Sequence, residues 1–417
     1  MFELIKETSS SIRKHKTRSM LTGLGISWGM FILIILLGIG QGLKEGTTSM
    51  FSDYATNSVW VTGGIVKETK IGGKPVGSII KFDDKIIGML KARIPEIQFV
   101  SPEVTLGQNI TTTYRHNSGH FEIKGVGIDY KKIKTLGFKV GRDLNVKDFR
   151  EKRRNVIIGE QVGKVLFGQN VDPIGKSIDI AGVYFKVVGV IEGGTMYGMM
   201  EENSIYMSDR TLFSTFGVER VYSTFGLLME NKGITVDYED EIRECLSKEM
   251  GFLSSDTRAL YVQNIQLQVE AFNYLFVGLN VFIWFVGCCI LLCGIIGVTN
   301  IMYLSAKERS REFGIRKAIG ATSGSILILL TTESLVITAV FGLLGMAMGY
   351  FGLNVFNEIL VMYPDSGILE IFGQASINTS IVIASLLLLI ACGIISGLLP
   401  ARKAASVMPI EALSQEN

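Results

Sequence analysis

The stretch of this sequence that comes closest to a catalytic motif is NVDPIGKS, residues 170–177. It approaches the pattern G-x-x-x-x-G-K-S/T, in which a glycine-rich backbone cradles nucleotide phosphates and opens a helix. Asn170 stands where that pattern needs its first glycine, and the following IDIAGVYFKVVGVI predicts a β-hairpin. We therefore interpret the stretch as a turn and expect no nucleotide to bind there.

Two histidines and a nearby carboxylate are the next candidates, in this case for a metal site. His116 and His120 are four residues apart, a spacing that on a helix would bring both rings to one ion, and Glu122 follows. The residues between them, Asn117 to Gly119, instead predict the tip of a hairpin. We expect a solvated loop here and no bound metal.

The cysteines offer neither a disulfide in the polar part of the chain nor a metal site. They are Cys245, Cys288, Cys289, Cys293 and Cys392. Only Cys245 lies outside the long apolar runs, and the run around Cys288 has no histidine or acidic neighbours, which favours simple packing. The sequence also offers no Ser–His–Asp, Cys–His or paired-carboxylate arrangement, so we expect no catalytic, metal or cofactor site in this chain.

A short charged stretch, SAKERSREFGIRKAIGA from Ser305 to Ala321, separates two long apolar runs. It is rich in lysine and arginine, which between two membrane spans marks the cytoplasmic side. Phe313, Ile315, Ala318 and Ile319 add an apolar set, of which the last three are at helical spacing, and this predicts a short amphipathic helix that offers apolar surface. Such a helix would lie across the membrane surface or dock into a partner's groove. An ordinary topogenic loop is the alternative.

Three stretches resemble, in order, those of the MacB-like (FtsX-like) ABC transporter permeases. ERSREFGIRKAIGA is similar to the coupling-helix motif of that family, the segment that fits into an ATPase and passes on its movement. KHKTRSMLTGLGISWGMFILIILLGIGQG, from Lys14 to Gly42, resembles the first span of the family. GLLPARKAASVMPIEAL, from Gly397 to Leu413, resembles its C-terminal signature, so the resemblance covers the whole chain.

The resemblance implies a non-catalytic permease subunit that works mechanically. A separate cytoplasmic ATPase would bind ATP and Mg, and this chain would bind no cofactor. A homodimer, or a heterodimer with a homologous permease, would form in the membrane lipid. A periplasmic adaptor (membrane fusion protein) and an outer-membrane channel would complete an efflux path. The residues assigned to coupling by the resemblance are Glu308, Arg309, Arg311, Glu312, Phe313, Gly314, Ile315, Arg316, Lys317, Ile319 and Gly320.

The elements that must position this stretch are membrane helices. Of the 417 residues, 47% are apolar and 19% charged, and the net charge of +2 offers no basic field to nucleic acid. Four apolar runs reach the ~20 residues that a bilayer requires. Basic residues flank these runs at the N terminus, at 305–317 and at 402–403, which predicts a multi-pass protein with both termini cytoplasmic. The resemblance places it in the bacterial inner (plasma) membrane.

The predicted order of segments follows from these runs. It is a cytoplasmic N-terminal segment at 1–19, a transmembrane helix at 20–43, a periplasmic core domain at 44–268, a stalk and second transmembrane helix at 269–304, the coupling helix at 305–325, a third transmembrane helix at 326–351, a periplasmic loop at 352–375, a fourth transmembrane helix at 376–399 and a cytoplasmic tail at 400–417. A cleaved signal peptide is the alternative for the first run, but that run is longer than a signal core and no small-residue cleavage site follows it.

The polar segment between the first two runs predicts a domain of mixed structure, because strand-like and helical stretches intermingle in it. In the family that the chain resembles, this domain has two lobes. By that analogy, residues 45–110 and 225–268 form the membrane-proximal lobe and residues 111–224 the inserted one. The predicted fold class is therefore an α-helical membrane protein with four transmembrane helices plus a large α+β extracytoplasmic domain of two lobes between helices 1 and 2.

Small residues and one carboxylate inside the apolar runs carry further predictions. Gly25 and Gly29 form a small-xxx-small pair, which is typical of a helix-contact face that could mediate the dimer; plain tolerance of glycine in a membrane helix is the alternative. Glu333 lies near the cytoplasmic third of the third run, and a charge at that depth normally faces protein or water. We expect it to pair with a basic residue at the membrane surface in a structural role. Glycines also recur along this run, at Gly342, Gly345, Gly349 and Gly352.

Export of a small molecule or peptide, driven by the partner ATPase, is the function that the sequence favours. A lipoprotein-releasing permease is the alternative within the same family. An FtsX-type signalling or regulatory mechanotransducer acting on cell-wall hydrolases is the alternative from another class. The large extracytoplasmic segment favours transport over regulation.

Overall fold

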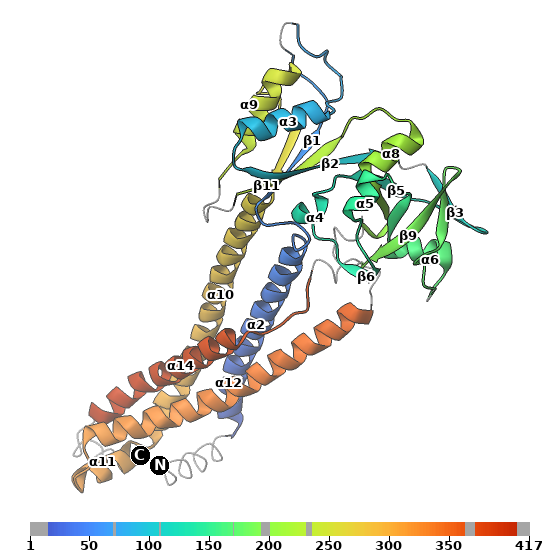
Figure 1. Ribbon diagram of the computed structural model, residues 1–417. Coiled ribbons are helices and arrows are strands. Elements are labelled where there is room, and N and C mark those ends of the chain that lie inside the picture. Colours follow the sequence, from blue (N-terminus) through green and yellow to red (C-terminus); the bar gives the residue numbers. More distant parts are fainter. Residues whose placement is uncertain are drawn as a thin grey trace. The chain divides into compact units, whose positions relative to one another are not determined.

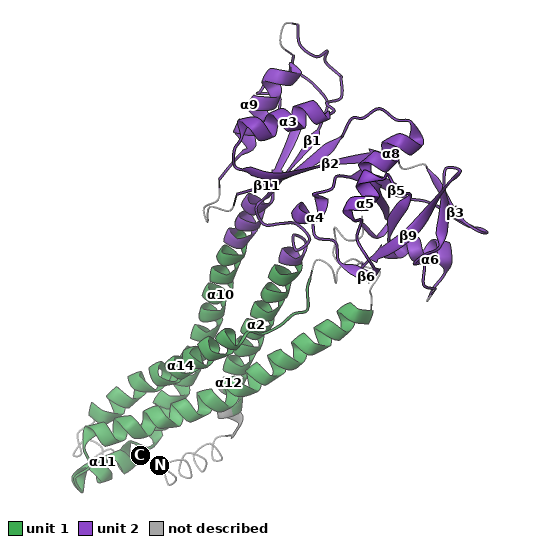
Figure 2. Ribbon diagram, in the orientation of Figure 1, with its two compact units in different colours: residues 1–46, 275–417 green, residues 47–274 purple. Residues whose placement is uncertain are grey.

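The computed structural model describes residues 16–69, 72–107, 110–169, 171–192, 201–230, 236–362 and 372–406 of the chain. It divides into two compact units, which we name the helical unit (residues 1–46 and 275–417) and the sheet unit (residues 47–274) (Figure 2). Most of the predicted N-terminal segment and C-terminal tail lies outside the described residues. Each unit has its own hydrophobic core.

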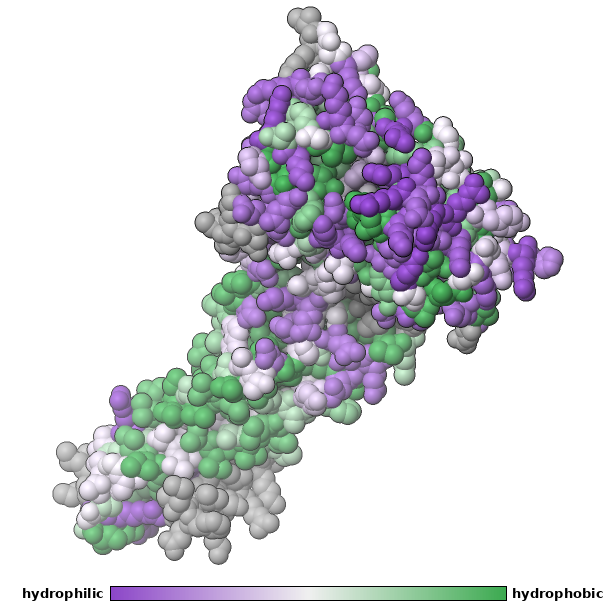
Figure 3. Space-filling view, viewed as in Figure 1, coloured by the Kyte–Doolittle hydropathy of each residue, from purple (hydrophilic) through white to green (hydrophobic). Residues whose placement is uncertain are grey.

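The helical unit is built from long apolar helices. Its described helices are α2 (Lys16–Ser49), α10 (Ile265–Glu308), α11 (Ser310–Ala318), α12 (Ser323–Met362) and α14 (Thr379–Ser406), of which α2 and α10 also reach into the sheet unit (Figure 1). All of them except α11 are long and apolar enough to cross a membrane. Apolar residues cover these helices on the face seen in Figure 3. The prediction of four membrane-spanning helices is thereby confirmed.

The long helices extend beyond the apolar runs from which they were predicted. α10 continues from Ile265 to Glu308 as one element, so the predicted stalk and second span are a single helix. α12 reaches Met362 instead of ending near residue 351, and α14 reaches Ser406 with Pro400 inside it. Hydropathy marks the stretch of a helix that suits lipid, whereas the backbone hydrogen bonds of the helix continue into more polar sequence.

Glycines allow α2 and α12 to approach until their backbones touch. A Cβ atom added to Gly345 would lie 2.1 Å from the carbonyl oxygen of Ser27, and one added to Gly349 would lie 2.7 Å from the side chain of Ile34. No side chain fits into so small a space, because real Cβ atoms keep at least a van der Waals distance from their neighbours. The glycines that recur along the third run therefore form a packing surface for the first helix.

The two glycines of the first span differ in their surroundings, because Gly29 is buried and Gly25 is exposed. A Cβ atom added to Gly25 would lie 4.0 Å from the Cα atom of Gly294 in α10. At Gly29 the neighbours are Ile290 and Leu291 of the same helix, each 3.2 Å away. Gly29 therefore packs against the second span of the same chain, while a role of Gly25 in a dimer stays a prediction.

The sheet unit holds a twelve-stranded mixed sheet (Figure 1). Its strands are β1 (Ser58–Gly63), β2 (Ile97–Leu106), β3 (Thr111–Tyr114), β4 (Asn117–His120), β5 (Glu122–Val126), β6 (Phe138–Gly141), β7 (Asn155–Gly159), β8 (Ser177–Ile180), β9 (Val183–Ile191), β10 (Ser204–Ser208), β11 (Thr224–Met229) and β12 (Leu260–Asn264). Their order is β12-β1-β11-β2-β5-β10-β7-β9-β8-β3-β4, and β6 pairs with β9. The described helices of this unit are α3 (Asp84–Arg93), α4 (Tyr130–Ile133), α5 (Val146–Arg150), α6 (Glu160–Phe167), α8 (Asp209–Phe216) and α9 (Glu239–Met250).

The strand order separates the strands by their origin in the sequence. β12, β1, β11 and β2 come from the two ends of the segment and are neighbours, while the remaining strands come from the insertion between them. α3 and α9 pack together beside the first group, with 3.7 Å between the sulfur atoms of Met89 and Cys245 (Figure 1). The prediction of a large mixed domain between helices 1 and 2 is confirmed, while its division into two lobes stays a prediction. The antiparallel pairing of β2 with β5 joins both groups into one sheet, which the analogy did not predict.

Candidate coupling site in the helical unit

The predicted coupling stretch folds as the end of one helix and the start of another. α10 runs on to Glu308, Arg309 stands between the helices, and α11 begins at Ser310. The Arg309 N–H donates to the Ser305 carbonyl of α10, and the Arg309 carbonyl accepts from Phe313 of α11, so both helices share this residue. α11 stops before Gly320, whose φ of +101° is open to glycine but strained for other residues.

A chain of ion pairs runs along α11. Arg309 Nε lies 3.0 Å from Glu312 Oε2, and Arg316 Nη2 lies 2.8 Å from Glu312 Oε1. The side-chain hydrogen bond from Arg309 is the largest of the influences that lower the pKa of the Glu312 carboxyl below its usual value. Glu312 therefore stays charged at neutral pH. Residues three or four positions apart are neighbours on a helix surface, which brings these three side chains together.

The same arginine reaches the carboxylate inside the third span. Arg309 Nη1 lies 3.2 Å from Glu333 Oε2 of α12, and the Glu333 side chain is only 5% exposed. The expectation that Glu333 pairs with a basic residue is confirmed. The sequence could not name that residue, because Arg309 is one of several cations in the stretch. This pair ties α11 to α12, and a buried carboxylate without it would lose its positive partner.

Phe313 is part of the core, and this corrects the prediction that it offers apolar surface to a partner. Its side chain is 1% exposed and belongs to the same buried cluster as Met302 and Ala306 of α10. Gly314 beside it is buried as well. The apolar side chains of an amphipathic helix can pack on the chain's own core or on a partner. Here the aromatic ring of Phe313 packs on the chain's own core. Phe313 is therefore a positioning residue for α11.

The opposite side of α11 is open. Ile315 is 48% and Ile319 is 82% exposed, and Arg311 is exposed one turn before Ile315. These residues follow one another at intervals of four, so they form one face, which we name the outward face. Exposed isoleucines cost free energy in water, so an apolar strip rimmed by charge is typical of a surface that binds a partner.

A second contact fixes the far end of α11. The Lys317 ammonium donates a hydrogen bond to the Ala405 carbonyl near the end of α14, and the Ser323 hydroxyl donates to the same oxygen. The end of α14, which belongs to the C-terminal signature, thus contacts the residues at both sides of the link between α11 and α12. Residues 407–413 of that signature lie outside the described part of the chain. Lys317 is consequently held by this chain. Two further charged residues of the predicted coupling set or its edge, Lys307 and Glu308, are exposed at the end of α10.

The phosphate-loop-like stretch folds as a turn before a hairpin. The Lys176 N–H donates to the Pro173 carbonyl and Gly175 has a φ of +80°, which together close a tight turn. β8 begins directly afterwards at Ser177 and pairs with β9. No helix starts here to present backbone N–H groups to a phosphate. Asn170 itself lies outside the described residues.

The histidine stretch forms the predicted hairpin, but with its tip in another place. β3 and β4 pair from Thr111 opposite His120 to Tyr114 opposite Asn117, so the tip is Arg115 and His116. Asn117 to Gly119, predicted as the tip, are part of β4. In the described part of the chain, no three histidine, cysteine or acidic side chains gather as metal ligands would.

Comparison with known families identifies the two units. Residues 19–244 match the MacB-like periplasmic core domain, and residues 284–409 match the FtsX-like permease C-terminal region. The fold and these matches define the class as a multi-pass ABC transporter permease with an extracytoplasmic domain. The first match covers more than half of the chain, and the chain belongs to the MacB-like periplasmic core domain family.

Several curated proteins are similar along the full chain. The macrolide export ATP-binding/permease protein MacB of Psychrobacter arcticus is 27% identical over 423 residues, which are 100% of this chain and 60% of that protein. The uncharacterized ABC transporter permease YknZ of Bacillus subtilis is 29% identical over 420 residues and is matched over 100% of both chains. This chain thus spans 60% of the length of the MacB relative and corresponds to its permease part.

Solved structures of extracytoplasmic domains are also similar. The extracellular domain of YknZ from Gram-positive bacteria aligns with a TM-score of 0.41 at 22% identity, covering 50% of this chain and 100% of that one. The periplasmic region of MacB from Actinobacillus actinomycetemcomitans aligns with a TM-score of 0.42 at 17% identity, covering 54% and 95%. The family assignment rests on the sequence matches above.

Proposed function

We propose that this chain is the membrane subunit of an ATP-driven export complex and passes movement from a separate ABC ATPase to its extracytoplasmic domain. The outward face of α11, with Ile315 and Ile319 exposed, is the observation that carries the proposal. An exposed apolar strip on a short helix suits helix-in-groove binding. The naming of MacB relatives as macrolide export proteins supports export of a small molecule or peptide as the work done.

The connections of α11 give this movement a path. Phe313 in the core and the Arg309–Glu333 pair oppose any displacement of α11 that leaves α10 and α12 behind. α10 is one helix of 44 residues, which corresponds to about 66 Å at 1.5 Å per residue. Its first residue, Ile265, directly follows the last residue of β12. No loop separates them that would absorb a push along the helix.

We propose an orientation in which α11 and both termini face the cytoplasm and the sheet unit faces outwards. The basic residues beside the spans favour it. In a cysteine-free background, a membrane-impermeant maleimide added outside intact cells should label Ser118→Cys and spare Ile319→Cys. Both positions are exposed in the chain, so the side of the membrane on which each lies determines whether the reagent labels it. Labelling of Ile319→Cys from outside would contradict the orientation.

The test of coupling is truncation of the outward face. Ile315→Ala with Ile319→Ala should weaken binding of the ATPase that co-purifies with the wild-type chain by about thirtyfold, since central interface anchors contribute ~2 kcal/mol. Export should fall in parallel, while the amount of chain in the membrane stays the same because neither side chain is in the core. Co-purification from membranes and an export assay measure the two effects.

The control is Ile79→Ala, because Ile79 is an isoleucine of the sheet unit whose exposure, 59%, lies between those of Ile315 and Ile319. It should leave ATPase retention unchanged. Wild-type retention and export in the double variant of α11 would mean that the stretch only sets membrane topology. Two permeases and a periplasmic adaptor are further parts of the complex that we propose.

A further inference from the structure

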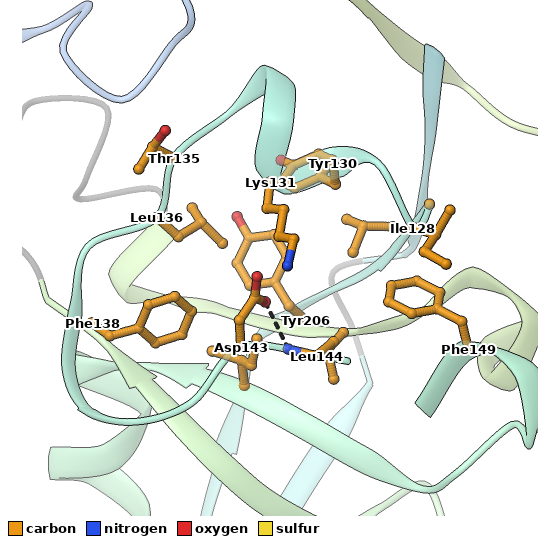
Figure 4. Close-up of a pocket in the computed structure, with 13 residues that line it drawn as sticks. Ile128, Tyr130, Lys131, Thr135, Leu136, Phe138, Asp143, Leu144, Phe149 and Tyr206 are labelled. Atoms are coloured by element: carbon orange, nitrogen blue, oxygen red, sulfur yellow. Dashed lines mark hydrogen bonds between the residues drawn. The ribbon is translucent and has the colours of Figure 1, made fainter. Parts of the chain in front are cut away.

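Basic side chains beside the pockets of the sheet unit have acidic neighbours. Lys131 and Asp143 both line the pocket in Figure 4, where their side chains point towards one another. In a second pocket, Glu160 Oε1 lies 2.7 Å from Lys139 Nζ and 3.2 Å from Lys164 Nζ. Opposite charges side by side largely cancel, so neither pocket attracts an ion of one sign.

One end of the helical unit carries cations that have no such neighbours. Lys307 near the end of α10 is exposed, and so are Arg402 and Lys403 near the end of α14. The ion pairs of this region are those of Arg309 and Arg316, and no carboxylate in the described part of the chain pairs with the three cations. Their positive charge is therefore left to attract an anion from outside the chain.

α10 and α14 lie side by side at this end. The Thr299 hydroxyl donates to the Ser396 carbonyl at 3.3 Å, and the Lys403 ammonium lies 4.9 Å from the centre of the Tyr303 ring. Lys307 follows Tyr303 at an interval of four, so it lies on the same face of α10, about 6 Å further along the helix. Cations of both helices thus gather beside the Tyr303 ring.

Exposed apolar side chains lead up to these cations. Leu399 is 61% exposed one turn before Lys403, and Ile296 is 61% exposed about two turns before Tyr303. Both belong to helices that are long and apolar enough to cross a membrane, where acyl chains surround such side chains. Tyrosines are enriched where acyl chains meet headgroups, and cations at that level face lipid phosphates.

We propose that an anionic phospholipid binds between the ends of α10 and α14, with its phosphate beside the three cations and its acyl chains along Leu399 and Ile296. One molecule then supplies both the missing negative charge and a cover for the apolar side chains. A soluble anion would supply only the charge, and a zwitterionic lipid carries a cation that opposes binding. This site is independent of the proposed coupling function, because the outward face of α11 contributes nothing to it.

The experiment titrates the full chain, purified in detergent, with dioleoyl phosphatidylglycerol and counts the bound lipids by native mass spectrometry. Wild type should bind this lipid more tightly than dioleoyl phosphatidylcholine. Arg402→Gln with Lys403→Gln should weaken phosphatidylglycerol binding about thirtyfold, because each basic residue near a lipid headgroup contributes about a factor of five. Phosphatidylcholine binding should not change. Both side chains are exposed, so the melting temperature should stay close to that of wild type.

Lys147→Gln with Arg150→Gln is the matched control. Both are exposed residues of α5 in the sheet unit, and their replacement changes the net charge by the same amount. This variant should bind phosphatidylglycerol as wild type does. Equal losses in the two double variants would overturn the proposal, and so would equal affinities of wild type for the two lipids.

Two further arms separate the lipid from other anionic partners. Glycerol phosphate carries the charge of the headgroup without acyl chains, so it should not displace phosphatidylglycerol at an equal concentration. Displacement would assign the cations to a soluble anion. If Arg402→Gln with Lys403→Gln loses the ATPase on co-purification but binds phosphatidylglycerol as wild type does, the cations serve the partner protein and the proposal fails.

Discussion

Arg309→Ala is expected to destabilise the helical unit by about 3 kcal/mol, because it removes the positive partner of a carboxylate that is buried in α12. Glu333 is 5% exposed and Arg309 is 21% exposed, so solvent compensates little for the loss. The substitution also releases Glu312 from one of its two arginines. The apparent melting temperature of the purified chain in nanodiscs and its yield in membranes should both fall.

A second substitution should reverse much of this loss. Glu333→Gln removes the buried charge, so the double variant with Arg309→Ala should melt at a higher temperature than Arg309→Ala alone. Lys307→Ala is the control, because it removes an exposed cation from the same stretch and should change the melting temperature little. A melting temperature of Arg309→Ala equal to that of wild type would mean that the pair contributes no stability. If the rescued double variant is stable but exports poorly, the pair also transmits movement from α11 to α12.

Gly345→Val is expected to separate α2 from α12 and to prevent the helical unit from packing. The new Cβ atom would lie 2.1 Å from the Ser27 carbonyl oxygen, and its closest neighbours are all backbone atoms, which no side-chain rotation can move away. Overpacking of this kind costs about 1–3 kcal/mol or more. The variant should give a lower melting temperature and a smaller share of monodisperse protein in size-exclusion chromatography.

Gly278→Val is the matched control for this prediction. Gly278 is also inside a long apolar helix, α10, and a Cβ atom there would meet nothing within 4 Å in this chain. Both variants carry the same cost of placing valine in a helix, so only the clash distinguishes them. Equal behaviour of the two variants would show that the close contact between α2 and α12 is not needed for folding.

The features that sequence alone predicted are those that depend on local composition. The four spans could be read from apolar runs, because transfer of a helix into lipid depends on its own residues. The turn before β8 and the β8–β9 hairpin were predicted from the strand-like residues that follow the turn, because a strand pattern is carried by neighbouring residues. The helix across 310–318 followed from its charges and spacing, and the ion pairs of Glu312 are set by intervals of three and four.

Features that depend on which surfaces meet were decided by the tertiary structure. Phe313 and Ile319 are both apolar residues of one stretch, yet the first is 1% and the second 82% exposed, because only one side of α11 faces the buried cluster of the helical unit. Gly29 packs on α10, and Arg309 instead of another cation reaches Glu333. Burial is a property of pairs of surfaces distant in sequence, so a single residue's chemistry does not determine it.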